Sequence, residues 1–214
     1  FVPPQGDAFA SVVFTNMFVE NHFLPDYRVD VGHIDTNVAL FDVTYGLTDR
    51  MAVTVGIPLV VSRYQGAFPH QPTNPTGPDN SGWNSTFSDL RFNVRYNMRR
   101  GAVAITPYVG SLVPSHGYDH VAHAAPGKNL RELQFGVATA GLLDRFVPGM
   151  FVQGRYGFAV VEETVGIRPN YSSGDIEVGY FVTPAFRVLG MAAGRYGHGG
   201  IDLPIPSIAR VVLP

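Results

Sequence analysis

Charged side chains recur at alternate positions in several extended segments, where they could line an interior. In residues 86–98, charged and amide side chains alternate with large apolar ones. An unpaired ion in a narrow interior costs several kcal/mol, so such charges must pair or meet water. Two interpretations stay open: a salt-bridged polar plug that passes nothing, or a narrow pore whose selectivity these charges tune. The ten candidate lumen-lining residues are Asp42, Asp89, Arg91, Arg95, Glu132, Arg155, Asp175, Glu177, Arg187 and Arg195.

Histidine and serine supply the other groups that could do chemistry. His116, His120 and His123 share one Pro/Gly-containing segment with Asp119, and three imidazoles could bind Zn²⁺ or Cu²⁺. Their spacing matches no known metal motif, so we predict no metal site and keep the three only as candidates. Ser115 precedes His116, but neighbours in sequence seldom form a triad, and no Gly-x-Ser-x-Gly elbow occurs. We therefore predict no enzyme and no cofactor.

Composition narrows the class of protein further. Only 15% of the 214 residues are charged, against about 25% in ordinary soluble domains. No run of 18 apolar residues occurs, which excludes a membrane-spanning helix. There is no cysteine for a disulfide or thiolate site, and a net charge of −2 without a basic patch gives no sign of nucleic-acid binding. A charge-poor, glycine-rich and aromatic-rich chain of this kind fits a transmembrane β-barrel.

Residues 51–59 show the clearest strand pattern with one apolar face. Every second residue from Met51 to Leu59 is large and apolar, and the residues between them are small or weakly polar. A period of two over nine residues predicts a strand. Soluble sandwiches usually fill both faces with bulkier side chains, whereas a barrel wall alternates between lipid and lumen.

Ten extended segments follow one another along the chain, and their connections alternate in length. Short turns are predicted at 46–49, 99–101, 144–149 and 183–184, and longer loops lie between them. Short periplasmic turns and long extracellular loops are typical of an antiparallel up-and-down transmembrane β-barrel. A soluble β-sandwich of a capsid or filament is the competing fold. The predicted strands are 8–20, 33–45, 50–62, 86–98, 102–113, 130–142, 150–161, 174–182, 186–196 and the stub 207–213.

The two ends of the sequence suggest a longer protein. It begins without Met and ends at Pro214 without the terminal aromatic residue common in outer-membrane barrels. We expect one barrel domain over residues 1–214 that lacks its C-terminal end. About ten strands are present, and twelve is the alternative count for a full-length protein.

Aromatic residues and one proline give two further expectations. Eight aromatic side chains near strand ends or on outward faces predict girdles at the membrane interfaces. Pro107 falls inside a predicted strand, where it removes a ladder hydrogen bond, so it should mark a bulge, a rim or a misplaced boundary. The eight aromatic residues are Tyr45, Tyr96, Tyr108, Phe146, Tyr156, Tyr180, Phe181 and Phe186.

Two segments carry a resemblance to a known family. Residues 45–60 (YGLTDRMAVTVGIPLV) and 88–96 (SDLRFNVRY) resemble recurrent strands of the outer-membrane β-barrels named for the "MetA-pathway of phenol degradation". These are transporter-like, porin-like membrane proteins of Gram-negative bacteria. The specific motifs cover roughly 30 residues of this chain. The family usually has further C-terminal strands.

The resemblance implies a location in the bacterial outer membrane and transport of small hydrophobic or aromatic solutes. Lipid and lipopolysaccharide would then be the surroundings, and the long extracellular loops could meet protein partners. The alternative function is a non-transporting structural barrel, an anchor or subunit of a larger envelope assembly.

Overall fold

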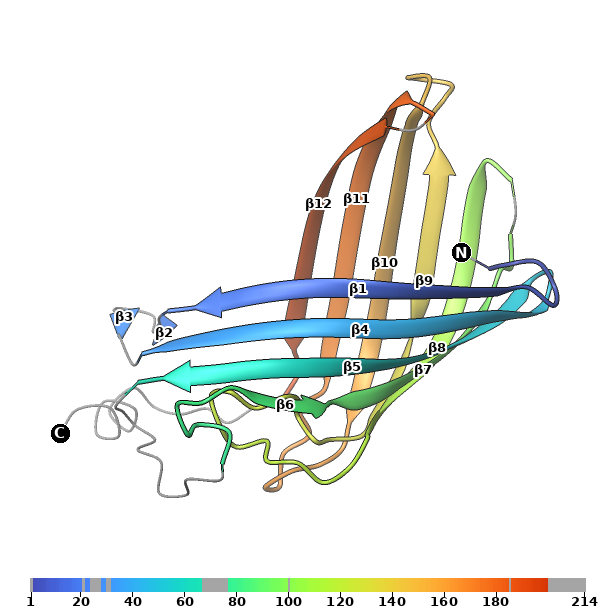
Figure 1. The fold of residues 1–214 in the computed structure, drawn as a ribbon. Helices are drawn as coiled ribbons and strands as arrows, with labels where there is room; N and C mark the ends of the chain where they lie inside the picture. Colours follow the sequence, from blue (N-terminus) through green and yellow to red (C-terminus); the bar gives the residue numbers. More distant parts are fainter. Residues whose placement is uncertain are drawn as a thin grey trace.

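The computed structural model describes residues 2–20, 22–23, 28–29, 32–66, 77–99, 101–184 and 186–199. It is all-β, and the main sheet holds ten antiparallel strands (Figure 1). No helix in the described residues is long and apolar enough to cross a membrane. The strands are β1 (Ala8–Val19), β4 (His33–Thr48), β5 (Met51–Gln65), β6 (Asn84–Phe87), β7 (Asp89–Tyr96), β8 (Val103–Pro114), β9 (Glu132–Leu142), β10 (Met150–Val161), β11 (Tyr171–Thr183) and β12 (Phe186–Gly197), with a separate pair β2 (His22–Phe23) and β3 (Arg28–Val29).

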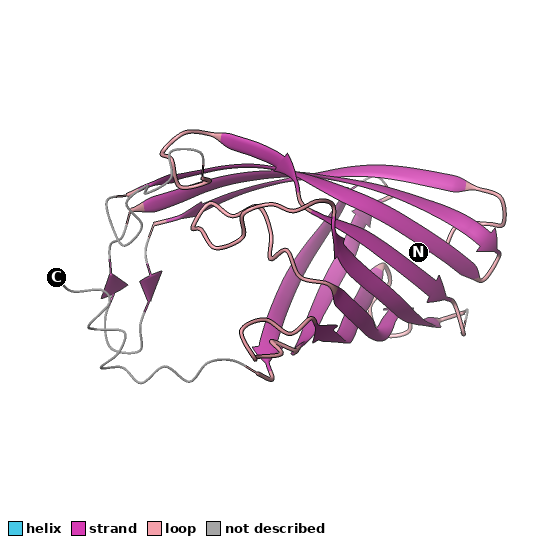
Figure 2. Ribbon diagram, turned by 90° about the horizontal axis from the view of Figure 1, so that it is seen from below, coloured by secondary structure: helices cyan, strands magenta, loops and turns pink. Residues whose placement is uncertain are grey.

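The strand order confirms the up-and-down prediction. Neighbours in the sheet follow the chain in the order β1-β4-β5-β7-β8-β9-β10-β11-β12, and β6 pairs with β5. The sheet curls into a half-barrel, so that β1, β4 and β5 run across the direction of β9 to β12 (Figures 1 and 2). Predicted boundaries differ by a few residues: β4 runs on to Thr48 past an irregularity after Gly46, and β11 begins at Tyr171. The predicted stub 207–213 lies outside the described residues.

Ser88 divides the single strand that was predicted over residues 86–98. Leu59 pairs with Phe87 and Gly56 pairs with Arg91, so three residues of the divided strand face two of β5. The Pro58 carbonyl accepts a 2.9 Å hydrogen bond from the Ser88 N–H. In an antiparallel strand the N–H and C=O of one residue point toward the same neighbouring strand. The N–H that Pro58 lacks would therefore also have pointed toward Ser88. A bulge at Ser88 accommodates that gap.

Pro107 lies at a second irregularity. Arg95 pairs with Tyr108, whereas the next bridge toward the turn joins Arg99 to Ile105. Three residues, 96–98, therefore face the two residues 106 and 107. Of the three predicted explanations for this proline, the structure shows the bulge.

The outward face of the sheet is apolar near the turns and becomes polar near the long loops. Phe41, Val43 and Val55 point outward, and each is more than 40% exposed. Farther toward the loops the same face carries the Asn16–Asn37 hydrogen bond of 2.9 Å and the Arg63–Asp35 ion pair of 2.7 Å. β4 has 16 residues and β5 has 15, whereas a tilted strand crosses a bilayer in about 9–11. The loop halves of these strands therefore reach beyond the apolar band.

Six of the eight aromatic residues fit the predicted girdles and two do not. Tyr45, Tyr96, Tyr180 and Phe186 are outward and exposed at the turn ends of their strands. Tyr156 is exposed on the same outward face and Phe146 is exposed in a turn. Tyr108 and Phe181 point inward: Tyr108 lies over glycines of the inner wall, and the Phe181 and Phe151 ring centroids are 5.1 Å apart. The girdle prediction was wrong for these two, because their register places them opposite inward-facing neighbours.

The change of outward polarity along β5 predicts a depth-dependent cost for a buried charge. Val55→Arg should lower the free energy of unfolding from lipid by about 2–4 kcal/mol, and Val61→Arg, on the same face beside Asn37, by about 0–1 kcal/mol. Urea titration of the protein in lipid vesicles would measure both. Equal losses at the two positions would contradict the membrane placement of β5.

Candidate functional site

The ten charged residues singled out from the sequence occupy one face of the sheet. Arg91 and Asp42 both pair with Gly56, and Arg155 pairs directly with Asp175. Directly paired residues share a face, and residues two apart along a strand share it too. Applied across all the registers, this rule places the whole set on the concave side of the sheet.

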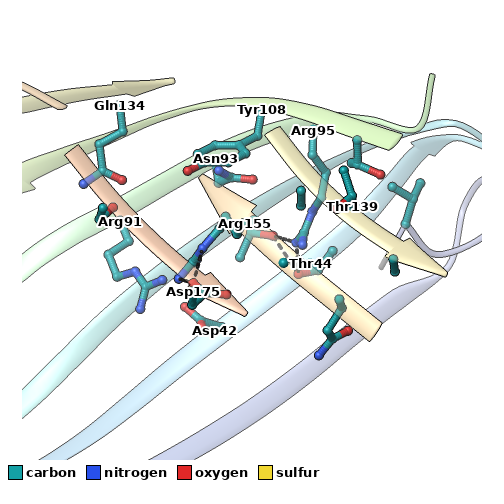
Figure 3. Close-up of a pocket in the computed structure, with 18 of the residues that line it drawn as sticks. Asp42, Thr44, Arg91, Asn93, Arg95, Tyr108, Gln134, Thr139, Arg155 and Asp175 are labelled. Atoms are coloured by element: carbon teal, nitrogen blue, oxygen red, sulfur yellow. Dashed lines mark hydrogen bonds and ion pairs between the residues drawn. The ribbon is translucent and has the colours of Figure 1, made fainter. Parts of the chain in front are cut away.

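A hollow of about 1030 Å³ lies on that concave side. Residues from β1, β4, β5 and β7 to β12 line it, and the N-terminal segment contributes Val2. Figure 3 shows polar and charged groups from both arms of the curled sheet pointing into this space. Six of the ten predicted residues line it: Asp42, Arg91, Arg95, Arg155, Asp175 and Arg195.

Arg155 and Asp175 form the ion pair of the hollow. Asp175 Oδ1 accepts hydrogen bonds from Arg155 Nε at 2.9 Å and from Arg155 Nη2 at 2.8 Å. The direct pairing of the two residues across β10 and β11 sets this geometry. The charge of Arg155 is therefore balanced within the wall.

Arg95 is held by hydroxyl groups. Its Nη2 donates to Thr44 Oγ1 at 3.2 Å and to Thr54 Oγ1, and the two hydroxyl oxygens are 2.7 Å apart. The Arg95 Nε atom is buried without a partner among the described residues. This guanidinium is thus fixed in position without a carboxylate bonded to it.

Asp42 and Arg91 lie in one row of the wall, with Gly56 between them. The Asp42 carboxylate leans over Gly56, where a Cβ would overlap its Oδ1 atom. That oxygen is buried and has no hydrogen-bond partner among the described residues. The register thus brings Asp42 close to Arg91, but among the described residues no ion pair joins Asp42 to Arg91 or Arg95.

Arg91 projects into open space. Within the described part of the chain it makes no ion pair and no hydrogen bond through its side chain. In Figure 3 its guanidinium points away from the wall, with no partner drawn to it. Arg195 also makes no ion pair among the described residues, but its guanidinium lies over the Tyr171 ring, 3.3 Å from the centroid. Of the four arginines in the lining, Arg91 is therefore the one with no partner among the described residues.

Residues 115–131, here called the cap loop, fold back onto the inner face near the long-loop end. Tyr118 donates a hydrogen bond to Asp89 and accepts one from the Asn129 N–H at 2.8 Å. Burial, together with the bond to Asp89, raises the pKa of Tyr118 to about 12. This raised pKa stabilises the fold fully below pH of about 10, and that stabilisation is lost as the pH rises toward 12. At neutral pH the phenol is protonated and donates to Asp89.

Asp79 and Tyr64 hold the middle of the cap loop. Asp79 accepts hydrogen bonds from the His123 N–H at 3.0 Å and the Ala124 N–H at 2.9 Å. The His123 ring stacks on Tyr64 with centroids 4.3 Å apart, and Ser62 donates to the Ala124 carbonyl at 2.6 Å. The sequence did not single out Asp79, Ser62 or Tyr118, because an aperiodic loop gives no sign of which residues it contacts.

Glu132 and Asp89 lie beneath the cap loop instead of lining the hollow. Glu132 is 4% exposed, pairs with Lys128 at 2.5 Å and accepts a 2.6 Å hydrogen bond from Tyr171. Asp89 receives the Tyr118 hydroxyl. The other two predicted residues, Glu177 and Arg187, share the inner face but are not part of the hollow's lining. The structure thus divides the predicted set into a group in the hollow, a group under the loop, and two residues elsewhere on the wall.

The candidate metal residues are not gathered into a site. His123 is occupied by Asp79 and Tyr64, His116 contacts Thr86 at 3.1 Å and Ser115 at 2.8 Å, and His120 lies 3.5 Å from Asn129. Among the described residues, no three His, Cys, Asp or Glu side chains could hold a metal ion.

The anchoring of the cap loop can be tested at a single peptide bond. Lys128 is the chain's only lysine, so a lysine-specific protease can cut at one place. Tyr118→Phe removes the donor to Asp89 and the acceptor of the Asn129 N–H, and should speed cleavage about tenfold if loop opening becomes easier by one hydrogen bond. Tyr180→Phe, on the exposed outward face, is the control and should leave the rate unchanged. Equal rates in all three proteins would show that Tyr118 does not hold the loop.

Comparison with known proteins identifies a solved structure with a similar fold. No protein-family model and no curated protein sequence matches this chain significantly. The crystal structure of an outer membrane channel from Pseudomonas putida F1 is similar, with a TM-score of 0.67, 15% sequence identity, and coverage of 94% of this chain and 76% of that one. The phenol-degradation family suggested by residues 45–60 is not shown by these matches and stays a prediction. The chain has the all-β fold of an outer membrane channel barrel.

Proposed function

We propose that this chain forms a channel for small solutes in the bacterial outer membrane and is not an enzyme. The observation that carries the proposal is the hollow of about 1030 Å³, polar on the concave side of a sheet whose outward face is apolar near the turns. Polar lumen and apolar exterior are what a barrel wall needs to pass solutes through lipid. The fold shared with an outer membrane channel supports both the location and the transport role.

The resemblance of residues 45–60 adds small hydrophobic or aromatic molecules as the solute class. Aromatic rings in the hollow are consistent with this: Phe9, Tyr108 and Tyr171 line it. Tyr108 lies against the wall over Gly136 and Gly157, where a Cβ would meet its hydroxyl group. A flat ring at the wall offers a stacking surface without closing the space.

A second candidate function is a structural barrel that passes nothing. The cap loop favours it, because Asp89 and Ser62 bond this loop to the inner face, and Asp79, in the segment between β5 and β6, bonds its middle. Such a barrel would serve as an anchor or subunit of an envelope assembly. Lipid and lipopolysaccharide would surround it, and the long loops would bind protein partners.

Conductance in planar lipid bilayers separates the two functions. The detergent-extracted protein should first show heat-modifiable migration on a gel, and extraction in plain buffer would contradict the membrane barrel. A channel should then give single-channel steps, and the Arg91→Ala/Arg95→Ala variant should give larger ones because two long side chains leave the hollow. No conductance in either protein would favour the structural barrel.

A further inference from the structure

The hollow carries an excess of positive charge. Its lining includes four arginines, Arg91, Arg95, Arg155 and Arg195, and two acids, Asp42 and Asp175. Two positive charges therefore remain unbalanced in a concave, partly enclosed space. A cleft lined by one sign of charge raises the local concentration of the opposite ion.

Arg91 is where this excess is available for binding. Arg155 is neutralised by Asp175, and Arg95 is tied to Thr44 and Thr54. The Arg195 guanidinium lies over the Tyr171 ring, 3.3 Å from its centroid. Arg91 has no such contact among the described residues. Its neighbour on β5 is Gly56, and the Asp42 carboxylate that leans over this glycine makes no ion pair with Arg91 among the described residues. A planar guanidinium with free N–H groups matches a carboxylate in a two-bond geometry.

The wall next to Arg91 is apolar on the side toward the long loops. Leu40 pairs with Val13 on one side and with Pro58 on the other. These three residues form the next inward-facing row toward the long loops after the row of Asp42 and Gly56. Leu112 pairs directly with Arg91 from β8 and also lines the hollow. Val13 is 51% exposed. Leu112 and Pro58 lie on the two strands that flank Arg91, whereas Leu40 and Val13 lie two and three strands away. A small solute bound at Arg91 thus meets Leu112 and Pro58.

We propose that the hollow binds small amphipathic monocarboxylates, with the carboxylate on the Arg91 guanidinium and the apolar part against Leu112 and Pro58. This inference rests on the proposed channel function and names its solute class. A neutral aromatic molecule would leave Arg91 without a partner, and a cation would be repelled by the excess positive charge. Net charge on the solute, more than the presence of a ring, decides binding.

Three probes of nearly equal size and different charge test the proposal: benzoate, benzyl alcohol and benzylamine. Calorimetric titration of the full chain in detergent measures binding, and block of the KCl conductance in bilayers measures access to the pore. Benzoate should bind and block at least tenfold more tightly than the alcohol, and the amine least, because a hydrogen-bonded guanidinium–carboxylate pair forms only with benzoate.

Variants locate the binding group. Arg91→Gln should weaken benzoate binding about tenfold and leave benzyl alcohol binding unchanged. Arg91→Lys keeps the positive charge but loses the two-bond geometry of a guanidinium. Its affinity for benzoate should lie between that of the unaltered protein and that of Arg91→Gln. Arg145→Gln removes the same charge in an exposed turn outside the hollow and should bind benzoate as the unaltered protein does.

The outcomes separate this inference from the channel function. Conductance with equal block by the three probes would overturn the carboxylate preference and leave the channel intact. Calorimetric preference for benzoate without conductance would uphold the binding site and overturn the channel. An equal loss in Arg91→Gln and Arg145→Gln would show that Arg91 is not the binding group. If Arg91→Gln failed to fold, the ranking of the three probes on the unaltered protein would still decide the question.

Discussion

Backbone hydrogen bonding between neighbouring strands is the constraint on which the rest of this structure depends. In the membrane location proposed for this chain, no water would replace a lost ladder bond, so strands would have to stay paired over the whole crossing. The long registers of β4 with β5 and of β11 with β12 meet that requirement. Once a register is set, every side chain is assigned to one face, and a slip of one residue would exchange lipid-facing and inward-facing residues. The arginines of the hollow owe their position to this pairing.

The two bulges show how the ladder tolerates residues that cannot donate. Pro58 and Pro107 each lie where the facing strand carries one more residue. A bulge changes the alternation locally, yet Arg91 and Arg95 stay inward because the register beyond Ser88 resumes without further shift. The prolines therefore cost a few ladder bonds and leave the inward face intact.

Sequence periodicity predicted most of the described strands, their order and the shared face of the ten candidate charged residues, because all three follow from a period of two and from connection length. It could not predict which charges pair. Arg155 forms an ion pair with Asp175, whereas Arg91 has no partner among the described residues, and that difference depends on the register between strands. It also could not place the cap loop. Glu132 and Asp89 have the same alternation as Arg91, but a loop with no periodicity covers them.

The inversion of polarity along β4 and β5 explains why the cap loop lies where it does. Near the turns the outward face is apolar and the inward face carries Asp42 and Thr44, as lipid on one side and water on the other require. Near the long loops the outward face carries Asp35 and Arg63, so this part of the wall stands in water. Its inward face then holds Val60 and Tyr64, which need cover, and both are almost fully buried. His123 stacks on Tyr64 and so supplies part of that cover. The same change of polarity along the wall thus creates the small apolar core on which the cap loop folds.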